Sequence, residues 1–179
     1  ALPARTQLDG PRERRGFSAL STALVLATMP MLVSAVARLW RYETTYGLTV
    51  LRLLAYAGLA LVAAVLAWRA LTLWVWPAHF VGGALGLLTV TLLGLAVLGP
   101  EAFIARRNLE MKEPDLGYLL TLSDEAMVPL AAKAADLEPV LQASVREAFK
   151  ERWLTLAQEP LLGWNVRRAQ AETVLREAH

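Results

Sequence analysis

The sequence predicts an all-α integral membrane protein with about three transmembrane helices, followed by a small amphipathic helical tail. Three observations predict this class. Long apolar runs at roughly 17–39, 53–76 and 80–98 occupy most of the first hundred residues. Each run is long enough to cross ~30 Å of hydrocarbon, because a helix rises about 1.5 Å per residue. Residues 100–179 show the mixed charge and the apolar spacing of packed helices.

Composition narrows the chemistry open to this chain. It has 179 residues, is 56% hydrophobic, carries a formal net charge of +2 and contains no cysteine. The lack of cysteine excludes disulfides and thiolate metal sites. His79 and His179 are far apart in the sequence, and no HExxH, GxGxxG or P-loop pattern occurs. We therefore expect no cofactor, no bound metal and no nucleic-acid partner. The expected partners are the lipid bilayer and a protein partner or a homo-oligomer within the membrane.

The first apolar run follows a basic lead-in at residues 1–16. The lead-in contains four arginines with proline and glycine, so we expect a mobile or surface-lying segment. The run after it exceeds the ~7–15-residue core of a signal peptide and is followed by more apolar runs, which favours a retained span. Pro30 lies near its middle and is a candidate kink, because proline removes one backbone hydrogen bond from a helix.

The connection at residues 38–52 is the most polar part of the front half of the chain. Aromatic rings prefer the headgroup level of a bilayer, and arginine reaches phosphates there by snorkelling. We expect a tight interfacial turn with Gly47 at its corner. A second turn at Pro77 and His79 makes the last two runs an antiparallel hairpin.

Two features inside the hairpin admit more than one interpretation. Arg69 lies near the end of its run, which favours snorkelling over a role in an ion pathway. Gly82 and Gly86 form a small-xxx-small pattern that allows close helix approach, so they are candidate helix-packing residues. This spacing predicts that their face meets another helix.

The tail begins at Pro100 with a short charged helix over residues 101–113. Ser123 is a suitable N-cap for a following helix, and Asp124 and Glu125 suit the positive end of its dipole. Pro139 begins another helix, and Pro160 begins the last one. The apolar stripe of the Pro139 helix comprises Leu141, Val145, Phe149 and Trp153.

Five strings of the sequence resemble a known group of proteins. They are RRGF at 14–17, YxxxYGLTxxR at 42–52, PEAxIARRNL at 100–109, DxxYLxxLS at 115–123 and WNxxRA at 164–169. Their order and spacing are similar to those of the bacterial multi-pass membrane proteins grouped as domain-of-unknown-function family 4173. The resemblance implies a helical fold and a bacterial inner membrane, and it assigns no activity. A single run between Arg15 and Arg38 departs from the family, which indicates a shortened member or a C-terminal piece.

The matching strings contain a candidate interfacial polar cluster. Three spans place the 38–52 connection and the exit at residues 106–108 on one side of the membrane, where Glu43 is expected to pair with Arg52 or Arg41. The alternatives are an ordinary anchor of aromatic residues and arginines, and a site for a lipid headgroup or a small anion. The cluster comprises Arg38, Arg41, Tyr42, Glu43, Tyr46, Arg52, Arg106, Arg107 and Asn108.

These features favour a structural or interaction protein whose helical tail and polar cluster contact a partner or lipid headgroups. The alternative is a transport or sensing module that acts as an oligomer or with further spans, based on Pro30, Arg69 and the cluster. An enzyme is not expected, because no placed nucleophile, acid–base pair or metal site is evident. Lysine and arginine counts on the two sides lean towards a cytoplasmic tail.

Overall fold

The fold was analysed in a computed structural model that describes residues 11–74, 79–111, 114–136, 139–156 and 173. Every element assigned in these ranges is a helix, which confirms the all-α prediction for the described residues. The chain forms two compact units. The first comprises Ala1–Glu43 and Leu51–Val97, and the second comprises Thr44–Val50 and Leu98–His179. The sequence predicts one boundary near residue 100, whereas the structure also assigns residues 44–50 to the second unit.

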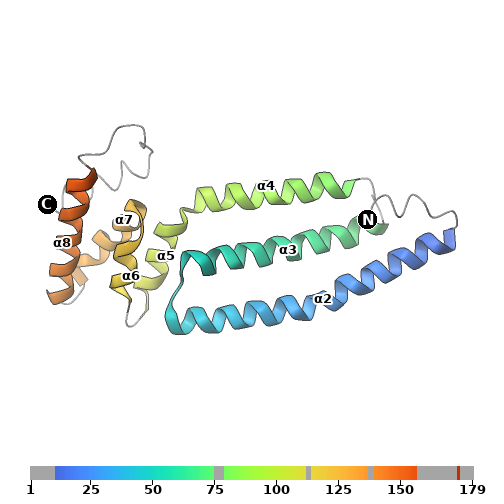
Figure 1. The fold of residues 1–179 in the computed structure, drawn as a ribbon, viewed down its shortest axis with the longest axis horizontal. Helices are drawn as coiled ribbons and strands as arrows, with labels where there is room; N and C mark the ends of the chain where they lie inside the picture. Colours follow the sequence, from blue (N-terminus) through green and yellow to red (C-terminus); the bar gives the residue numbers. More distant parts are fainter. Residues whose placement is uncertain (1–10, 75–78, 112–113, 137–138, 157–172, 174–179) are drawn as a thin grey trace. The chain divides into compact units, whose positions relative to one another are not determined.

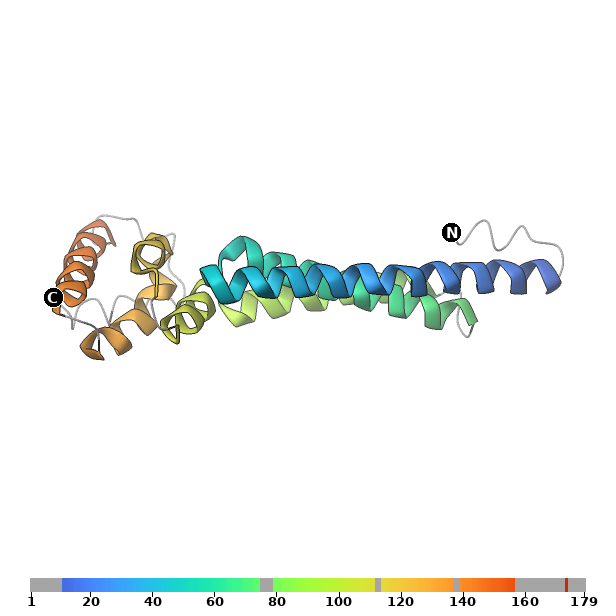
Figure 2. The same ribbon diagram turned by 90° about the horizontal axis from the view of Figure 1, so that it is seen from below.

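Three long helices account for the first unit and for the predicted spans. They are α2 (Pro11–Tyr46), α3 (Val50–Trp74) and α4 (Phe80–Leu98), and all three are long and apolar enough to cross a membrane. Figure 1 shows α3 between α2 and α4, with α3 and α4 running in opposite directions. In Figure 2, which is turned by 90°, the three helices overlap. Within this unit the helices therefore form a layer about one helix thick.

Helix α2 extends beyond the predicted span at both ends. The sequence predicts a span at 17–39 after a basic, mobile or surface-lying lead-in at 1–16, whereas the helix runs from Pro11 to Tyr46. Arginines do not end a helix, and Pro11 suits a first helical position. At the other end Gly47 adopts a φ of 75°, which terminates the helix and confirms this glycine as the corner of the turn. The predicted long connection is thus mostly helical, and the turn is confined to residues 47–49.

The other two spans lie close to their predicted positions. Helix α4 has the predicted bounds, Phe80–Leu98. Helix α3 runs from Val50 to Trp74 instead of 53–76, so Arg52 lies in its first turn. The end predicted at Trp76 and the turn residue Pro77 fall outside the described residues.

Very little of the three spans is buried within the chain. In the most apolar stretch of each helix, the share of buried residues is 6% for α2, 6% for α3 and 0% for α4. In water such surfaces would drive collapse or aggregation, whereas lipid chains solvate them. The burial pattern therefore agrees with helices that lie in a bilayer.

The second unit is a cluster of short helices after the last span. These are α5 (Pro100–Leu109), α6 (Leu116–Thr121), α7 (Asp124–Lys133), the 3₁₀ helix η2 (Ala134–Asp136) and α8 (Pro139–Leu156). Helix α5 packs mainly against α7. The apolar core of this unit includes the buried side chains of Ile104, Leu109, Leu119, Ala126, Met127, Leu130, Val145 and Phe149. Unlike the spans, this unit has the apolar core of an ordinary folded helical domain.

The tail helices follow the predicted starts. Ser123 occupies the N-cap position of α7 as predicted, although its hydroxyl makes no capping hydrogen bond there. Its backbone N–H donates instead to the Glu101 carboxylate of α5. Helix α8 begins at Pro139, and Val145 and Phe149 of its apolar stripe are buried. The side chains of Leu141 and Trp153 and the helix predicted from Pro160 lie outside the described residues.

Candidate functional site

The turn between α2 and α3 is held in the second unit by the side chain of Asn108 on α5. The Leu48 N–H donates to Asn108 Oδ1 at 2.7 Å, and Asn108 Nδ2 donates to the Leu48 carbonyl at 2.8 Å. Leu48 is 3% exposed and Asn108 is 4% exposed, so both hydrogen bonds are shielded from water. One side chain therefore satisfies both backbone polar groups of a buried turn residue.

An asparagine amide suits this position because it carries an acceptor and a donor in one plane, as a peptide group does. Aspartate lacks the donor, and a leucine of similar size lacks both groups. Leaving a buried backbone group without its partner costs about 1–3 kcal/mol. The pair between Asn108 and Leu48 is thus a specific attachment of the turn to α5.

Gly47 makes the close approach of the turn possible. Its φ of 75° lies in the left-handed region that side chains disfavour. A Cβ atom at this position would lie 3.1 Å from Asn108 Oδ1 and 3.3 Å from the sulfur of Met111. Both the backbone conformation and the space around it therefore call for glycine.

Tyr118 of α6 provides a second attachment. Its hydroxyl oxygen accepts a hydrogen bond from the Val50 N–H at 3.1 Å. Val50 is the first residue of α3, so this bond satisfies one of the N–H groups that a helix start leaves without an intrahelical partner. Tyr118 is itself held by Asp115, whose carboxylate accepts from the Tyr118 N–H at 3.0 Å.

Sequence reasoning included Asn108 in the polar cluster but assigned Gly47 only to a turn and left Tyr118 out. Asn108 was grouped with arginines as part of an anchor or an anion site, whereas its amide pairs with the chain's own backbone. The signal for Tyr118 was present in the DxxYLxxLS string at 115–123. That string gives the position of the tyrosine but not the backbone group that it meets.

The other cluster residues of the second unit lie at its surface. Tyr46, Arg106 and Arg107 are exposed. Arg107 forms an ion pair with Glu110 at 3.3 Å, a pair one helical turn apart on the surface of α5. Exposed pairs of this kind contribute little to stability. Arg106 lines a hollow between α5 and α7 together with Glu110 and Lys133.

The cluster residues of the first unit lie at the C-terminal end of α2 and the start of α3. Arg38, Arg41 and Tyr42 are exposed on α2. The Glu43 carboxylate accepts a hydrogen bond from the Tyr56 hydroxyl of α3 at 2.7 Å. The sequence predicts an ion pair of Glu43 with Arg52 or Arg41, and this pair stays a prediction. Tyr56 was missed because it follows Arg52 by one turn within an apolar run, where a core role is the ordinary interpretation.

Trp68 connects the C-terminal part of α3 to the start of α4. Its indole N–H donates to the Phe80 carbonyl at 3.3 Å. A Cβ atom on Gly83 would lie 2.0 Å from Trp68 Nε1, so the ring occupies the space that this glycine leaves. The glycine that packs inside the hairpin is therefore Gly83. At Gly82 and Gly86, the predicted packing residues, no atom of the described chain would lie within 4 Å of a Cβ.

Arg69 lies against an aromatic ring at the same end. Its guanidinium carbon is 5.1 Å from the centroid of the Phe80 ring, a cation–π distance. This contact agrees with an arginine anchored near the end of a span. Among the residues that the structure describes, no three His, Asp or Glu side chains are grouped so that they could hold a metal ion.

Comparison with known proteins gives one match. A family model described as a domain of unknown function, DUF4153, matches residues 2–132. This range includes all three spans and four of the five strings named in the sequence analysis, but not the string at 164–169. The expectation of a family without assigned activity is confirmed, but the family that matches is DUF4153 and not the expected family 4173. No curated protein and no solved structure matches the chain.

Proposed function

We propose that this chain, which belongs to the DUF4153 family, is a non-catalytic interaction subunit of a bacterial cytoplasmic membrane. Its three spans associate in the bilayer with another polypeptide, which is a partner protein or a second copy. The second unit forms an extramembrane helical platform. The observation that carries the proposal is the exposure of α4. This helix has no buried residue among those described, and it contains the small-xxx-small pattern of Gly82 and Gly86.

Helices in a bilayer associate by close van der Waals packing, since lipid is as apolar as their side chains. Small residues favour this packing because they let two backbones approach. Among the described residues, the ring of Trp68 occupies the space beside Gly83 of α4, whereas no atom would lie within 4 Å of a Cβ at Gly82 or Gly86. This arrangement supports a face of α4 that is suited to a helix from another polypeptide.

The second unit supports the same role on the membrane surface. The chain between α2 and α3 is attached to α5 and α6 through Asn108 and Tyr118. A segment that joins two spans is thereby built into the core of the extramembrane helices. We infer that a partner docks on this unit, which includes the segment that joins two spans.

Photocrosslinking in native membranes tests the association. The chain has no cysteine, so Gly86→Cys is a single-cysteine variant that can carry benzophenone maleimide. Leu88→Cys is the matched control, because it lies two residues away on the other side of the same helix. We expect a discrete crosslinked protein from position 86 and not from position 88. Equal or no crosslinking at both positions, with a chain that purifies alone as a monomer, would contradict the proposal.

The orientation is tested separately. Lys133 lies at the exposed end of α7, so Lys133→Cys places a thiol on the surface of the second unit. If this unit is cytoplasmic, a membrane-impermeant maleimide should label it only after spheroplasts are permeabilised. Labelling of intact spheroplasts would place the second unit on the outer side.

A further inference from the structure

Two hollows run along α2 on either side of one row of residues. The row is Pro30, Ser34 and Arg38, spaced four apart, and these three residues line both hollows. The volumes are about 650 Å³ for the first hollow and about 890 Å³ for the second. Such volumes are in the range of small-molecule sites. The row therefore forms a ridge with a hollow on each flank and an arginine at one end.

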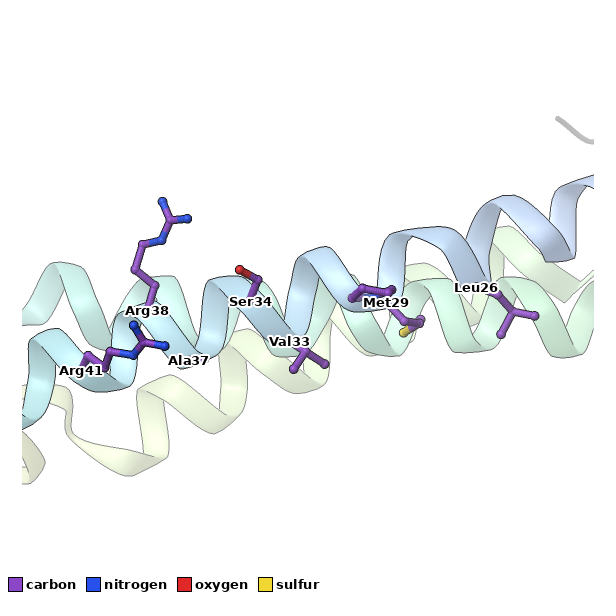
Figure 3. Close-up of a pocket in the computed structure, with 8 residues that line it drawn as sticks. Leu26, Met29, Val33, Ser34, Ala37, Arg38 and Arg41 are labelled. Atoms are coloured by element: carbon purple, nitrogen blue, oxygen red, sulfur yellow. The ribbon is translucent and has the colours of Figure 1, made fainter.

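The first hollow is lined by α2 alone. Figure 3 shows Arg38 and Arg41 at one end of it, and Met29 and Leu26 towards the other. Apolar side chains thus follow the cationic end along the helix. From Arg38 to Leu26 the axial distance is about 18 Å, since a helix rises ~1.5 Å per residue. This length is close to one leaflet, which is half of ~30 Å of hydrocarbon.

The second hollow lies between α2 and α3. Its apolar wall includes Met31 and Ala35 from α2 and Leu59 from α3, and Tyr42 stands beside Arg38 at the polar end. Gly58 contributes to its depth, because no atom would lie within 4 Å of a Cβ at that position. Both hollows therefore combine a cationic end with a largely apolar wall.

Arg38 has a free guanidinium in the described part of the chain, where it makes no ion pair and no hydrogen bond. Figure 3 shows its side chain extending away from the α2 ribbon. A guanidinium binds a phosphate through two parallel hydrogen bonds. At the end of a span, the phosphates within reach are those of lipid headgroups.

We propose that α2 binds one diacyl phospholipid with an anionic headgroup. Arg38 holds the phosphate, and the two acyl chains lie in the two hollows flanking the Pro30–Ser34–Arg38 row. The inference shares with the proposed function the insertion of α2 in a membrane. It needs no protein partner, so the two can fail independently.

Native mass spectrometry of the full chain in a non-ionic detergent tests the site, with dioleoylphosphatidylglycerol as the titrated lipid. Arg38→Gln removes the charge and should weaken binding about tenfold, a difference of about 1.4 kcal/mol. Arg107→Gln is the charge-matched control on α5 and should bind as the wild type does. Circular dichroism verifies that both variants keep their helix content.

A second pair of variants tests the hollows without changing charge. Gly58→Leu fills the hollow between α2 and α3, whereas Gly94→Leu adds the same side chain to open space on α4. We expect Gly58→Leu to weaken lipid binding several-fold and Gly94→Leu to leave it unchanged.

The nature of the ligand is tested with two further probes. Glycerol 3-phosphate carries the phosphate without acyl chains and should not bind measurably. Dioleoylphosphatidylcholine carries both chains but no net charge and should bind more weakly than the anionic lipid. Glycerol 3-phosphate bound as tightly as the lipid would assign a free-phosphate site instead. Unchanged lipid binding in both Arg38→Gln and Gly58→Leu would overturn the proposal.

Discussion

Asn108 and Leu48 lie sixty residues apart in the chain and are joined by two buried hydrogen bonds. The bonds run in both directions between one side-chain amide and the N–H and carbonyl of one residue. They connect the turn that follows the first span to the helix that follows the third.

Asn108→Ala should destabilise the second unit by about 2–6 kcal/mol. It leaves the Leu48 N–H and carbonyl buried without partners, at about 1–3 kcal/mol for each group. Arg107→Ala on the same helix is exposed and should change stability by about 0.5 kcal/mol or less. Thermal unfolding in detergent measures both variants. Equal melting temperatures for the two would show that the Asn108 bonds contribute little.

Gly47→Ala should destabilise the chain by about 1–3 kcal/mol. The left-handed backbone at a φ of 75° disfavours a side chain, and the added Cβ would crowd Asn108 Oδ1 at 3.1 Å. Gly94→Ala is the control, since it adds the same methyl group to open space within α4. Guanidinium unfolding followed by circular dichroism compares them. A Gly47→Ala variant as stable as Gly94→Ala would mean that the turn can adopt another conformation.

Gly83→Ala should destabilise the α3–α4 hairpin by about 1–3 kcal/mol, whereas Gly82→Ala in a detergent-solubilised monomer should not. The methyl group at 83 would lie 2.0 Å from Trp68 Nε1, so the indole must move and lose its bond to the Phe80 carbonyl. Trp68→Leu should remove most of the difference between Ala and Gly at 83. The four-variant cycle isolates this coupling, and a coupling near zero would contradict the observed packing.

Arg152→Ala should destabilise the second unit by about 1–2 kcal/mol. Arg152 Nε donates to Asp124 Oδ1 at 2.8 Å, and a second guanidinium nitrogen donates to the Leu122 carbonyl at 2.6 Å. These bonds attach α8 to the start of α7, and charge-assisted bonds of this kind exceed neutral ones. Lys150→Ala is an exposed control on the same helix. Unfolding monitored by tryptophan fluorescence is the measurement, and a loss no larger than that of the control would exclude a structural role for Arg152.

The position of the spans followed closely from the sequence wherever helix-breaking residues mark an end. Helix α4 has its predicted bounds, and Gly47 is the predicted corner. Helix α2 is longer than the span predicted at 17–39, because the charged residues around 12–15 and 38–43 mark only the edge of an apolar run. They do not mark the end of a helix, which continues until backbone geometry stops it.

The candidate site was predicted only in part. The strings at 42–52 and 100–109 contain the residues that form the attachment of the turn, and Asn108 was selected among them. Its role was not predictable, because an amide on a helix surface has the same sequence signature whether it meets a ligand or a backbone turn. For the same reason spacing alone favoured Gly82 and Gly86, whereas the position of the Trp68 ring selects Gly83.

The sequence by itself determined that this chain has three apolar helices followed by amphipathic ones, since both properties depend on local hydrophobicity and its period. Only the tertiary structure decided that Asn108 and Tyr118 hold the turn, that Glu43 meets Tyr56, and that Arg38 ends two hollows. The bonds of Asn108 and Tyr118 depend on contacts between segments 60 and 68 residues apart in the chain. Local composition cannot specify such contacts, because it does not determine which backbone groups the fold brings together.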